Sequence, residues 1–314
     1  VNKMSKCLVT GGAGFIGSHL VDRLLKNNNQ VVVIDNESAE ANEEFYHNPH
    51  AEYHTVDIRN MDDCSVLFSG VDTVFHLAAH SRIQIAMENP QECLETNIQG
   101  TVNMLECARQ AGVRRFVNSS TSSVYGLKNE PPLQEVMPTH CLNHYSASKR
   151  SAEIMCEMYN NLYGLRTISL RYFNVYGDRQ PLKGQYAPVI GLFLEQLKRG
   201  EALTIVGDGE QRRDFTHVDD VVEANMCAML TNFSGISVNI GTGKNYSVND
   251  VAAMISDNVT YIPPREGEAR ETLAEIYKAA VAFNWFPSKK LEDYIYEELE
   301  NTSPLPWRKE QSDN

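Results

Sequence analysis

The sequence predicts a doubly wound α/β fold built on a parallel sheet, with a smaller C-terminal substrate-binding lobe. A glycine-rich turn follows the first apolar strand pattern, and an aspartate closes the second. Strand patterns and helical patterns alternate, which is typical of a parallel sheet covered by helices on both faces. The strands are expected near 6–10, 30–35, 73–79, 114–119 and 166–171, and the helices near 14–27, 61–69, 90–111 and 144–163.

The turn after the first strand is a candidate dinucleotide-binding loop. Between Thr10 and Gly17 it has glycines at 11, 12, 14 and 17, which satisfy both G-x-G-x-x-G and the looser G-x-x-G-x-x-G. Glycines here allow a tight turn, close approach of a pyrophosphate and close packing of the helix on the sheet. The helix N-terminus offers N–H groups and a positive dipole end to phosphates. The loop alone is weak evidence, because ordinary turns also contain glycines.

The second strand strengthens this interpretation. Gln30 to Ile34 is a continuous apolar run that ends in Asp35, about twenty residues past the loop, where a carboxylate accepts the adenosine ribose hydroxyls. The same carboxylate would repel the 2′-phosphate of NADP. The sequence therefore predicts binding of NAD rather than NADP.

Composition limits the classes of partner. The 314 residues carry a net charge of −13 and leave no broad basic face for nucleic acid or an anionic membrane. Seven scattered cysteines form no CxxC pair, which suggests reduced thiols in the cytoplasm. No apolar segment approaches the roughly eighteen residues that span a bilayer. We expect a cytoplasmic protein with neither a nucleic-acid nor a membrane partner.

Two further segments border the predicted site. Glu52 to Ile58 can add a strand, with Asp57 either near the adenine amino group or serving as a helix N-cap or loop acid. The strand from Thr73 runs into small residues that would let a cofactor lie against the backbone. Its histidines, His76 and His80, lack a third ligand at metal-binding spacing. We predict that they are structural or support a neighbouring site residue, and that the chain has no metal site.

The candidate catalytic centre combines a hydroxyl-rich strand end with the start of a helix. Ser119 to Ser123 follow an apolar strand, and Tyr145 and Lys149 lie four residues apart in a helical pattern, hence on one face. A tyrosine has a pKa near 10, and a nearby ammonium favours its phenolate. A Thr or Ser hydroxyl could bind the oxygen being deprotonated. Tyr-x-x-x-Lys also arises by accident on amphipathic helices, but here it follows a dinucleotide loop and a hydroxyl-rich strand end.

Taken together, the chain resembles the extended short-chain dehydrogenase/reductase superfamily, and within it the NAD-dependent nucleotide-sugar epimerases and dehydratases. The resemblance covers most of the chain. Its motifs are Thr10 to Gly17, Asp35-Asn36, Asp57-Ile58, His76 to Ala79, Asn97, Ser119 to Gly126, Tyr145 to Lys149 and Leu170 to Gly177.

The resemblance assigns roles to individual residues. It implies Thr121, Tyr145 and Lys149 as catalytic residues, and a homodimer formed through a four-helix bundle of helices near 92–111 and 144–163. The implied NAD contacts are Gly11, Gly14, Phe15, Ile16, Gly17, Asp35, Asn36, Asp57, Ile58, Leu77, Ala78, Ala79, Asn97, Ser119, Tyr145, Lys149 and Tyr172.

The substrate side is expected mainly in residues 178–314, interleaved with an NAD-binding domain at 1–177. Arg213 and Arg265 would hold a diphosphate, and Glu268 a nucleotide ribose. Val206 departs from the family, where many relatives have an aromatic ring against the base. Thr272 falls where relatives restricted to plain hexoses often have tyrosine. The implied substrate contacts are Ser81, Thr121, Tyr145, Asn174, Val189, Val206, Arg213, Arg265, Glu268 and Thr272.

The reaction is inferred from two missing acids. Relatives that eliminate water have an Asp-Glu pair just after the catalytic threonine, where this chain has Ser122 and Ser123. We therefore expect 4-epimerisation of a UDP-sugar through a 4-keto intermediate, interconverting UDP-GlcNAc with UDP-GalNAc and, as a second pair, UDP-Glc with UDP-Gal. A different nucleotide-sugar oxidoreductase or dehydratase stays open as an alternative, as does a non-catalytic NAD-binding sensor.

Overall fold

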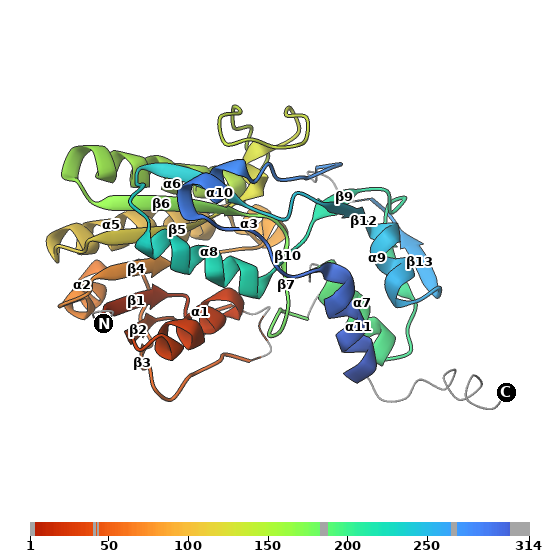
Figure 1. The fold of residues 1–314 in the computed structure, drawn as a ribbon, viewed down its shortest axis with the longest axis horizontal. Coiled ribbons are helices and arrows are strands. Elements are labelled where there is room, and N and C mark those ends of the chain that lie inside the picture. Colours follow the sequence, from red (N-terminus) through yellow and green to blue (C-terminus); the bar gives the residue numbers. More distant parts are fainter. Residues whose placement is uncertain (1–3, 40–41, 43, 183–187, 265–268, 302–314) are drawn as a thin grey trace.

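The computed structural model describes residues 4–39, 42, 44–182, 188–264 and 269–301. A layered α/β body is built mainly from the N-terminal half of the chain, and a smaller lobe lies beyond one edge of it (Figure 1). Within the described part, no helix is both long enough and apolar enough to cross a bilayer.

The main sheet is parallel throughout, as predicted. Among the described residues it has seven strands in the order β11-β6-β5-β4-β1-β2-β3. The strand order reverses beside β1, which pairs with β2 on one side and β4 on the other. Ligands of such sheets bind at this reversal, outside the carboxyl ends of the strands. The strands are β1 (Lys6–Thr10), β2 (Gln30–Ile34), β3 (Glu52–His54), β4 (Thr73–His76), β5 (Arg115–Thr121), β6 (Arg166–Tyr172) and β11 (Ile236–Ile240).

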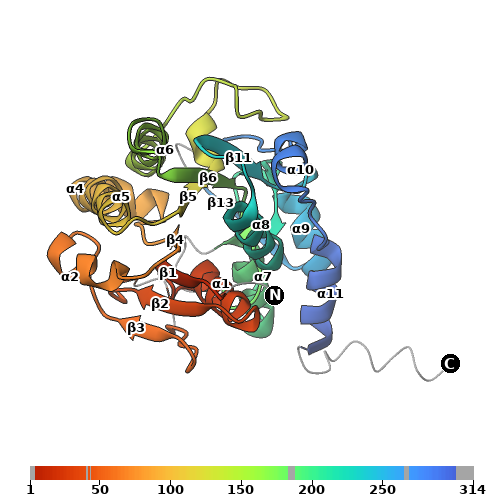
Figure 2. The same ribbon diagram turned by 60° about the vertical axis from the view of Figure 1, so that its left-hand side comes forward.

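Helices cover both faces of the sheet (Figure 2). Side chains alternate along each strand, so Cys7 and Val9 of β1 enter one core and Leu8 enters the other. The first core is covered by α1 (Phe15–Lys26), α8 (Val218–Leu230) and α10 (Tyr277–Phe283). The second is covered by α2 (Met61–Ser65), η1 (Val66–Phe68), α5 (Gly100–Gln110) and α6 (His144–Tyr163).

The smaller lobe has its own apolar core, which includes Phe193, Ile205, Val251 and Ile295. Its strands form two-stranded pairs, parallel for β8 with β13 and antiparallel for β9 with β12. A parallel pair of β7 (Val175–Tyr176) and β10 (Thr216–His217) lies where it meets the main body. The lobe's elements are α7 (Val189–Lys198), β8 (Leu203–Val206), β9 (Arg212–Asp214), β12 (Asn245–Ser247), α9 (Val248–Ile255), β13 (Val259–Ile262) and α11 (Leu291–Asn301).

Several elements differ from the sequence prediction. The strand expected at 73–79 ends at His76. Beyond it, the Leu77 N–H donates to the Thr10 carbonyl oxygen at 3.0 Å, and the N–H groups of Leu77 and Ala78 both reach the Thr10 hydroxyl at 3.2 Å. The helix expected at 90–111 is divided into α4 (Pro90–Leu94), the π-helical η2 (Glu95–Gln99) and α5. The short α3 (Ile83–Glu88) and η3 (Ser122–Tyr125) were not predicted, nor was β11, which completes the main sheet from within residues 178–314.

The start of α6 is fixed by a capping box. The Asn143 side chain accepts a hydrogen bond from the Ser146 N–H at 2.9 Å, and the Ser146 hydroxyl accepts one from the Asn143 N–H at 3.3 Å. Such a box satisfies N–H groups that the first helical turn leaves unpaired. It places Tyr145 in that first turn, directly beside the carboxyl end of β5.

Candidate active site

The glycines of the first turn separate into two kinds. A Cβ on Gly11 would lie 2.7 Å from the Ala78 nitrogen, and one on Gly17 only 2.0 Å from the Gly11 carbonyl oxygen. A Cβ on Gly12 would meet the Val33 side chain at 2.6 Å. These three glycines are required by the protein's own packing. A Cβ on Gly14 would meet nothing closer than 3.5 Å, so only an approaching ligand would need a glycine there.

This loop is suited to a pyrophosphate. Gly14 is the N-cap of α1, and no side chain caps the helix. The first-turn N–H groups therefore point towards the side on which Gly14 leaves room. Phe15 and Ile16, the other implied contacts in this segment, are half-buried at the start of the helix.

Asp35 ties the second strand to the glycine loop. Its Oδ2 accepts a hydrogen bond from the Ala13 N–H at 3.0 Å, and its Oδ1 accepts one from the Glu37 N–H at 2.9 Å. Burial raises the pKa of Asp35, while these two hydrogen bonds act in the opposite direction. The carboxylate thus lies at the end of β2 next to the loop, where the sequence placed the ribose contact.

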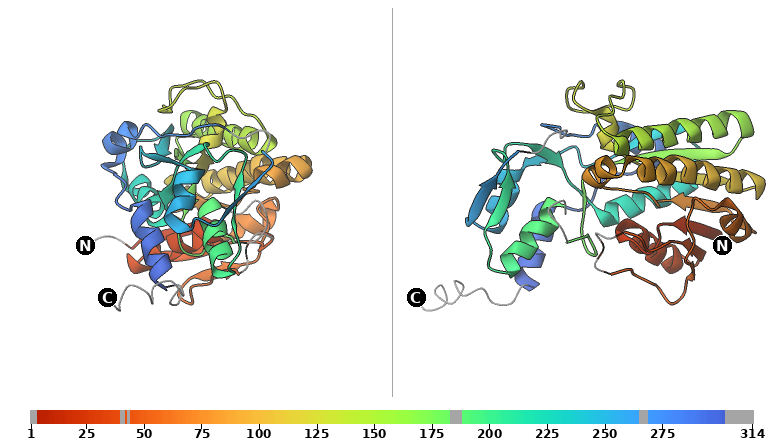
Figure 3. Two further views of the ribbon diagram at one scale, coloured as in Figure 1. Left: turned by 90° about the vertical axis from the view of Figure 1, so that its right-hand side faces the viewer. Right: turned by 180° about the vertical axis from the view of Figure 1, so that it is seen from behind.

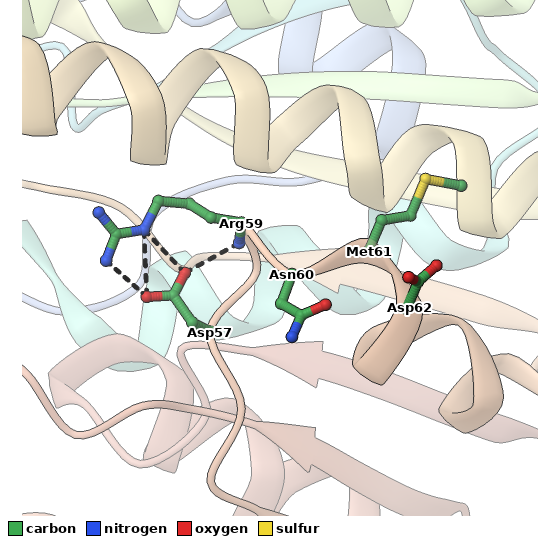
Figure 4. Close-up of a pocket in the computed structure, with 5 residues that line it drawn as sticks. All are labelled: Asp57, Arg59, Asn60, Met61 and Asp62. Atoms are coloured by element: carbon green, nitrogen blue, oxygen red, sulfur yellow. Dashed lines mark hydrogen bonds and ion pairs between the residues drawn. The ribbon is translucent and has the colours of Figure 1, made fainter.

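Asp57 is a loop acid and not a helix cap. The Arg59 guanidinium donates hydrogen bonds to both carboxylate oxygens of Asp57, the shortest at 2.7 Å (Figure 4). The Asn36 amide donates another at 3.2 Å. The Arg59 guanidinium is the main cause of the lowered pKa of Asp57. Asn60, not Asp57, caps α2. Ile58, the other implied contact here, is buried against Gly100.

Both ring nitrogens of the buried His76 are hydrogen-bonded to hydroxyl groups. Its Nδ1 is bonded to the Thr10 hydroxyl at 2.8 Å and its Nε2 to the Thr101 hydroxyl at 3.0 Å. Burial, followed by the charge of Lys149, lowers the pKa of His76 to about 3, so the ring is neutral. Within the described ranges, no group of three or more His, Cys, Asp or Glu residues could hold a metal ion.

Asn97 joins three segments around the site. Its amide exchanges hydrogen bonds with the backbone of His80, at 2.8 and 3.0 Å, and donates to the Ser148 hydroxyl at 2.9 Å. Only 1% of Asn97 is exposed. The side chain therefore holds the loop after β4 against α6, and Ala79 lies within that loop while Ser81, next to His80, is exposed.

The three implied catalytic residues meet at the carboxyl end of β5. Thr121 ends that strand, and its hydroxyl lies close enough to the half-buried Tyr145 to lower the pKa of the tyrosine. Lys149, one turn further along α6, is buried and donates to the Ser119 carbonyl oxygen at 3.0 Å. The Ser119 hydroxyl is bonded to the Tyr172 hydroxyl at 3.0 Å, which brings β6 into the same cluster.

The electrostatics of the cluster differ from the sequence prediction. Burial raises the pKa of Tyr145, and the Thr121 hydrogen bond and the charge of Arg82 lower it in part. Burial also lowers the pKa of Lys149 to about 8. Lys149, the cation expected to act on Tyr145, lies one turn further along α6, and the charge of Arg82, which was not among the predicted site residues, also favours the phenolate.

Three of the implied substrate residues come together beyond β6. The Asn174 amide donates to the Asp214 carbonyl oxygen at 3.0 Å and to the Thr272 hydroxyl at 3.3 Å. Arg213 is the neighbour of Asp214 on β9, and its guanidinium donates to the Arg212 carbonyl oxygen at 3.0 Å. Asn174 has a φ of +24°, a conformation that asparagine tolerates better than most residues.

Two of the other implied substrate residues, Val189 and Val206, belong to the smaller lobe. Val206 ends β8 and is half-buried, and Val189 begins α7 and packs on the core of the lobe. Arg265 and Glu268 lie outside the described residues.

Three features together define the site of a dinucleotide-dependent enzyme. They are the glycine loop after β1, Asp35 at the end of β2, and the cluster of Thr121, Tyr145 and Lys149. A model of the family described as NAD dependent epimerase/dehydratase matches residues 7–241, and the chain belongs to this family. NAD is its cofactor, which agrees with the room left at Gly14. The chain is an enzyme of NAD-dependent nucleotide-sugar epimerase/dehydratase chemistry.

Similar proteins cover nearly the whole chain. A Methanocaldococcus jannaschii protein provisionally named UDP-glucose 4-epimerase is 40% identical over 92% of this chain and 95% of its own. The UDP-glucose 4-epimerase of Thermotoga maritima, solved with UDP-glucose, matches with a TM-score of 0.89 and 36% identity over 95% and 100% of the two chains. The UDP-N-acetylglucosamine 4-epimerase of Methanobrevibacter ruminantium, solved with UDP-N-acetylmuramic acid, also has a TM-score of 0.89, with 32% identity over 95% and 98%.

Replacing Gly14 tests the fit of the pyrophosphate. In Gly14→Ala the new methyl group has room in the free protein, so stability should fall by less than about 1 kcal/mol. The methyl would occupy the ligand's place, so NAD affinity, measured by calorimetry on cofactor-free protein, should fall roughly tenfold or more, about 1.4 kcal/mol. Gly17→Ala is the contrasting variant, because its clash with the Gly11 carbonyl oxygen should lower the melting temperature itself. Unchanged NAD affinity in Gly14→Ala would contradict this placement.

Proposed function

We propose that this protein catalyses the 4-epimerisation of a UDP-sugar through a transient 4-keto sugar. The observation that carries the proposal is the cluster of Thr121, Tyr145 and Lys149 without an acid at the two following positions. Ser122 and Ser123 form the η3 turn, and the Ser123 hydroxyl is bonded to Thr121 at 3.1 Å. Hydroxyl groups with ordinary pKa values do not supply the proton transfers that elimination of water requires.

Each residue of the cluster has its own role in the reaction at the sugar's C4 hydroxyl. Tyr145, as the phenolate, takes the proton of this hydroxyl and later returns it, while Thr121 binds the oxygen that loses it. Lys149 is placed to hold the nicotinamide ribose and to add positive charge. NAD, when bound, accepts the hydride from C4 and returns it. A keto sugar that turns over in the pocket between these two events leaves with inverted configuration at C4.

The nucleotide and sugar are assigned from the second cluster. Arg213 offers a guanidinium for a diphosphate, beside Asn174 and Thr272. Solved relatives act on UDP-glucose and on UDP-N-acetylglucosamine. We assign both pairs to this chain, with UDP-GlcNAc and UDP-GalNAc as the principal one, because Thr272 is smaller than the tyrosine that relatives restricted to plain hexoses often have there.

The decisive assay is incubation with a panel of UDP-sugars, followed by chromatography of the products. Because the hydride leaves and returns within one turnover, epimerisation should proceed without added NAD and without accumulation of NADH. Tyr145→Phe should keep NAD binding but lower turnover about a hundredfold or more, the scale of a positioned acid/base group. Stoichiometric NADH release would instead favour a net oxidoreductase, and near-normal turnover of Tyr145→Phe would overturn the role of Tyr145.

Replacing Thr272 tests the sugar specificity. In Thr272→Tyr the larger ring would fill space beside Asn174, so turnover of UDP-GlcNAc and UDP-GalNAc should fall at least tenfold more than turnover of UDP-Glc and UDP-Gal. Thr260→Tyr, on an exposed position of β13, is the matched control and should change neither. Equal losses on all four sugars, or a wild-type enzyme inert towards acetamido sugars, would remove the argument from pocket size.

A homodimer formed through α5 and α6 is the assembly that we propose. These helices lie side by side on one face of the molecule (Figure 3). Ile154, Met158 and Leu162, spaced by four along α6, are 47%, 36% and 66% exposed, which gives an apolar stripe on one helix face.

The compartment that we propose for the enzyme is the cytoplasm. All seven cysteines are free thiols, which fits a reducing compartment.

Charge on this stripe should dissociate the dimer. Met158→Glu with Leu162→Glu should halve the mass measured by light scattering, because two carboxylates per subunit would have to be buried. Val66→Glu is the control, since Val66 is 72% exposed but lies on η1 away from the stripe. A wild-type monomer, or a double variant that stays dimeric, would contradict the proposed interface.

A further inference from the structure

Arg179 has an unusual backbone conformation in the segment between β7 and α7. Its φ is +61°, in the left-handed region that residues with a side chain seldom adopt. A glycine would adopt this φ at lower cost. The segment is also anchored, because the His19 Nε2 of α1 is hydrogen-bonded to the Asp178 carbonyl oxygen at 2.8 Å. An arginine held in this conformation points to a role for its side chain.

The Arg179 side chain reaches the NAD-binding part of the protein. Its Nη2 lies 2.8 Å from Oδ2 of Asp22 in α1, and its Cζ lies 5.0 Å from the centroid of the Tyr46 ring. The other carboxylate oxygen of Asp22 accepts a hydrogen bond from the Asn48 amide at 2.7 Å. Arg179 and Asp22 together therefore hold residues 44–48 against α1.

The segment held in this way contacts the glycine loop. The Tyr46 N–H donates to the Ala13 carbonyl oxygen at 2.9 Å, and the Ala13 N–H donates to Asp35 at 3.0 Å. The Ala13 carbonyl and the Gly14 N–H belong to one planar peptide group. Tyr46 thus helps to set the orientation of Gly14, the residue at which the structure leaves room for a ligand.

The ion pair between Arg179 and Asp22 is too exposed to be explained by fold stability. The two side chains are 30% and 37% exposed, and exposed pairs add little to the stability of a fold. A guanidinium can, however, pair with a carboxylate and stack on an aromatic face at the same time. We therefore expect the Arg179 contacts to act on the placement of Tyr46 more than on folding.

We propose that Arg179 is a positioning residue for NAD. Its guanidinium holds Asp22 and the Tyr46 ring together, and the backbone of Tyr46 then keeps the Ala13–Gly14 peptide in the orientation that receives the pyrophosphate. Arg179 acts through Tyr46 and does not itself contact the cofactor. The segment that leads into the smaller lobe thereby supports the NAD loop. This role concerns cofactor binding and is independent of the sugar that the enzyme converts.

The test is the NAD affinity of cofactor-free protein, measured by calorimetry. Arg179→Met keeps the length of the side chain without its charge, so the Kd for NAD should rise about fivefold, the effect of losing a cation–π contact with its ion pair. Arg179→Lys keeps a cation and should recover part of this loss. Tyr46→Leu should weaken NAD binding by a similar factor. The double variant should be no weaker than the weaker single variant, because both changes remove the same contact.

Two further variants serve as controls. Arg23→Met removes an arginine of the same helix that pairs with Glu223 of α8, and it should leave the NAD affinity unchanged. Arg179→Gly, which suits the φ of this position, replaces Arg179→Met if the latter does not fold, as judged by circular dichroism. A wild-type NAD affinity in the uncharged variants overturns the proposal, as do losses that simply add in the double variant. The assay contains no sugar, so a failure of the proposed 4-epimerase activity would leave its result intact.

Discussion

The position of the active site depends on one buried ion pair. Glu153 of α6 accepts hydrogen bonds from the Arg171 guanidinium of β6 at 2.8 and 2.7 Å, and from the Ser120 hydroxyl of β5 at 2.6 Å. Both charged side chains are almost fully buried, and breaking such a pair by removing one partner costs about 3–5 kcal/mol. The pair fixes α6 on two strands at once. Lys149 and Tyr145, one and two turns earlier on α6, are thereby held over the ends of those strands.

Burial sets the proton states of this site. It raises the pKa of Tyr145 above its ordinary value of 10.0 and lowers that of Lys149 from 10.5 to about 8, so the two pKa values, nearly equal in water, move apart. The neutral forms are favoured on both, which leaves the tyrosine protonated in the free protein.

The sequence predicted the features that have local patterns. Continuous apolar runs identified β1 and β2, the glycine spacing identified the loop after β1, and the four-residue spacing placed Tyr145 and Lys149 on one helix face. The hydrogen bonds by which Asn97 holds the loop after β4 against α6 escaped prediction, because they join segments far apart in the chain. β11 escaped it for a related reason: what makes Ile236–Ile240 the edge strand of the main sheet is its pairing with β6.

The segment that leaves β6 connects the catalytic side to the substrate side. Tyr172 binds the Ser119 hydroxyl within the catalytic cluster, and two residues later Asn174 binds Thr272 and the backbone of Asp214. Asp214 is fully buried and accepts hydrogen bonds from Thr242, Gly243 and Ala274, which gathers the loops of the smaller lobe around this point. Asn174 follows Tyr172 by only two residues, so the backbone that leaves β6 joins the Thr121, Tyr145 and Lys149 cluster directly to the loops of the smaller lobe.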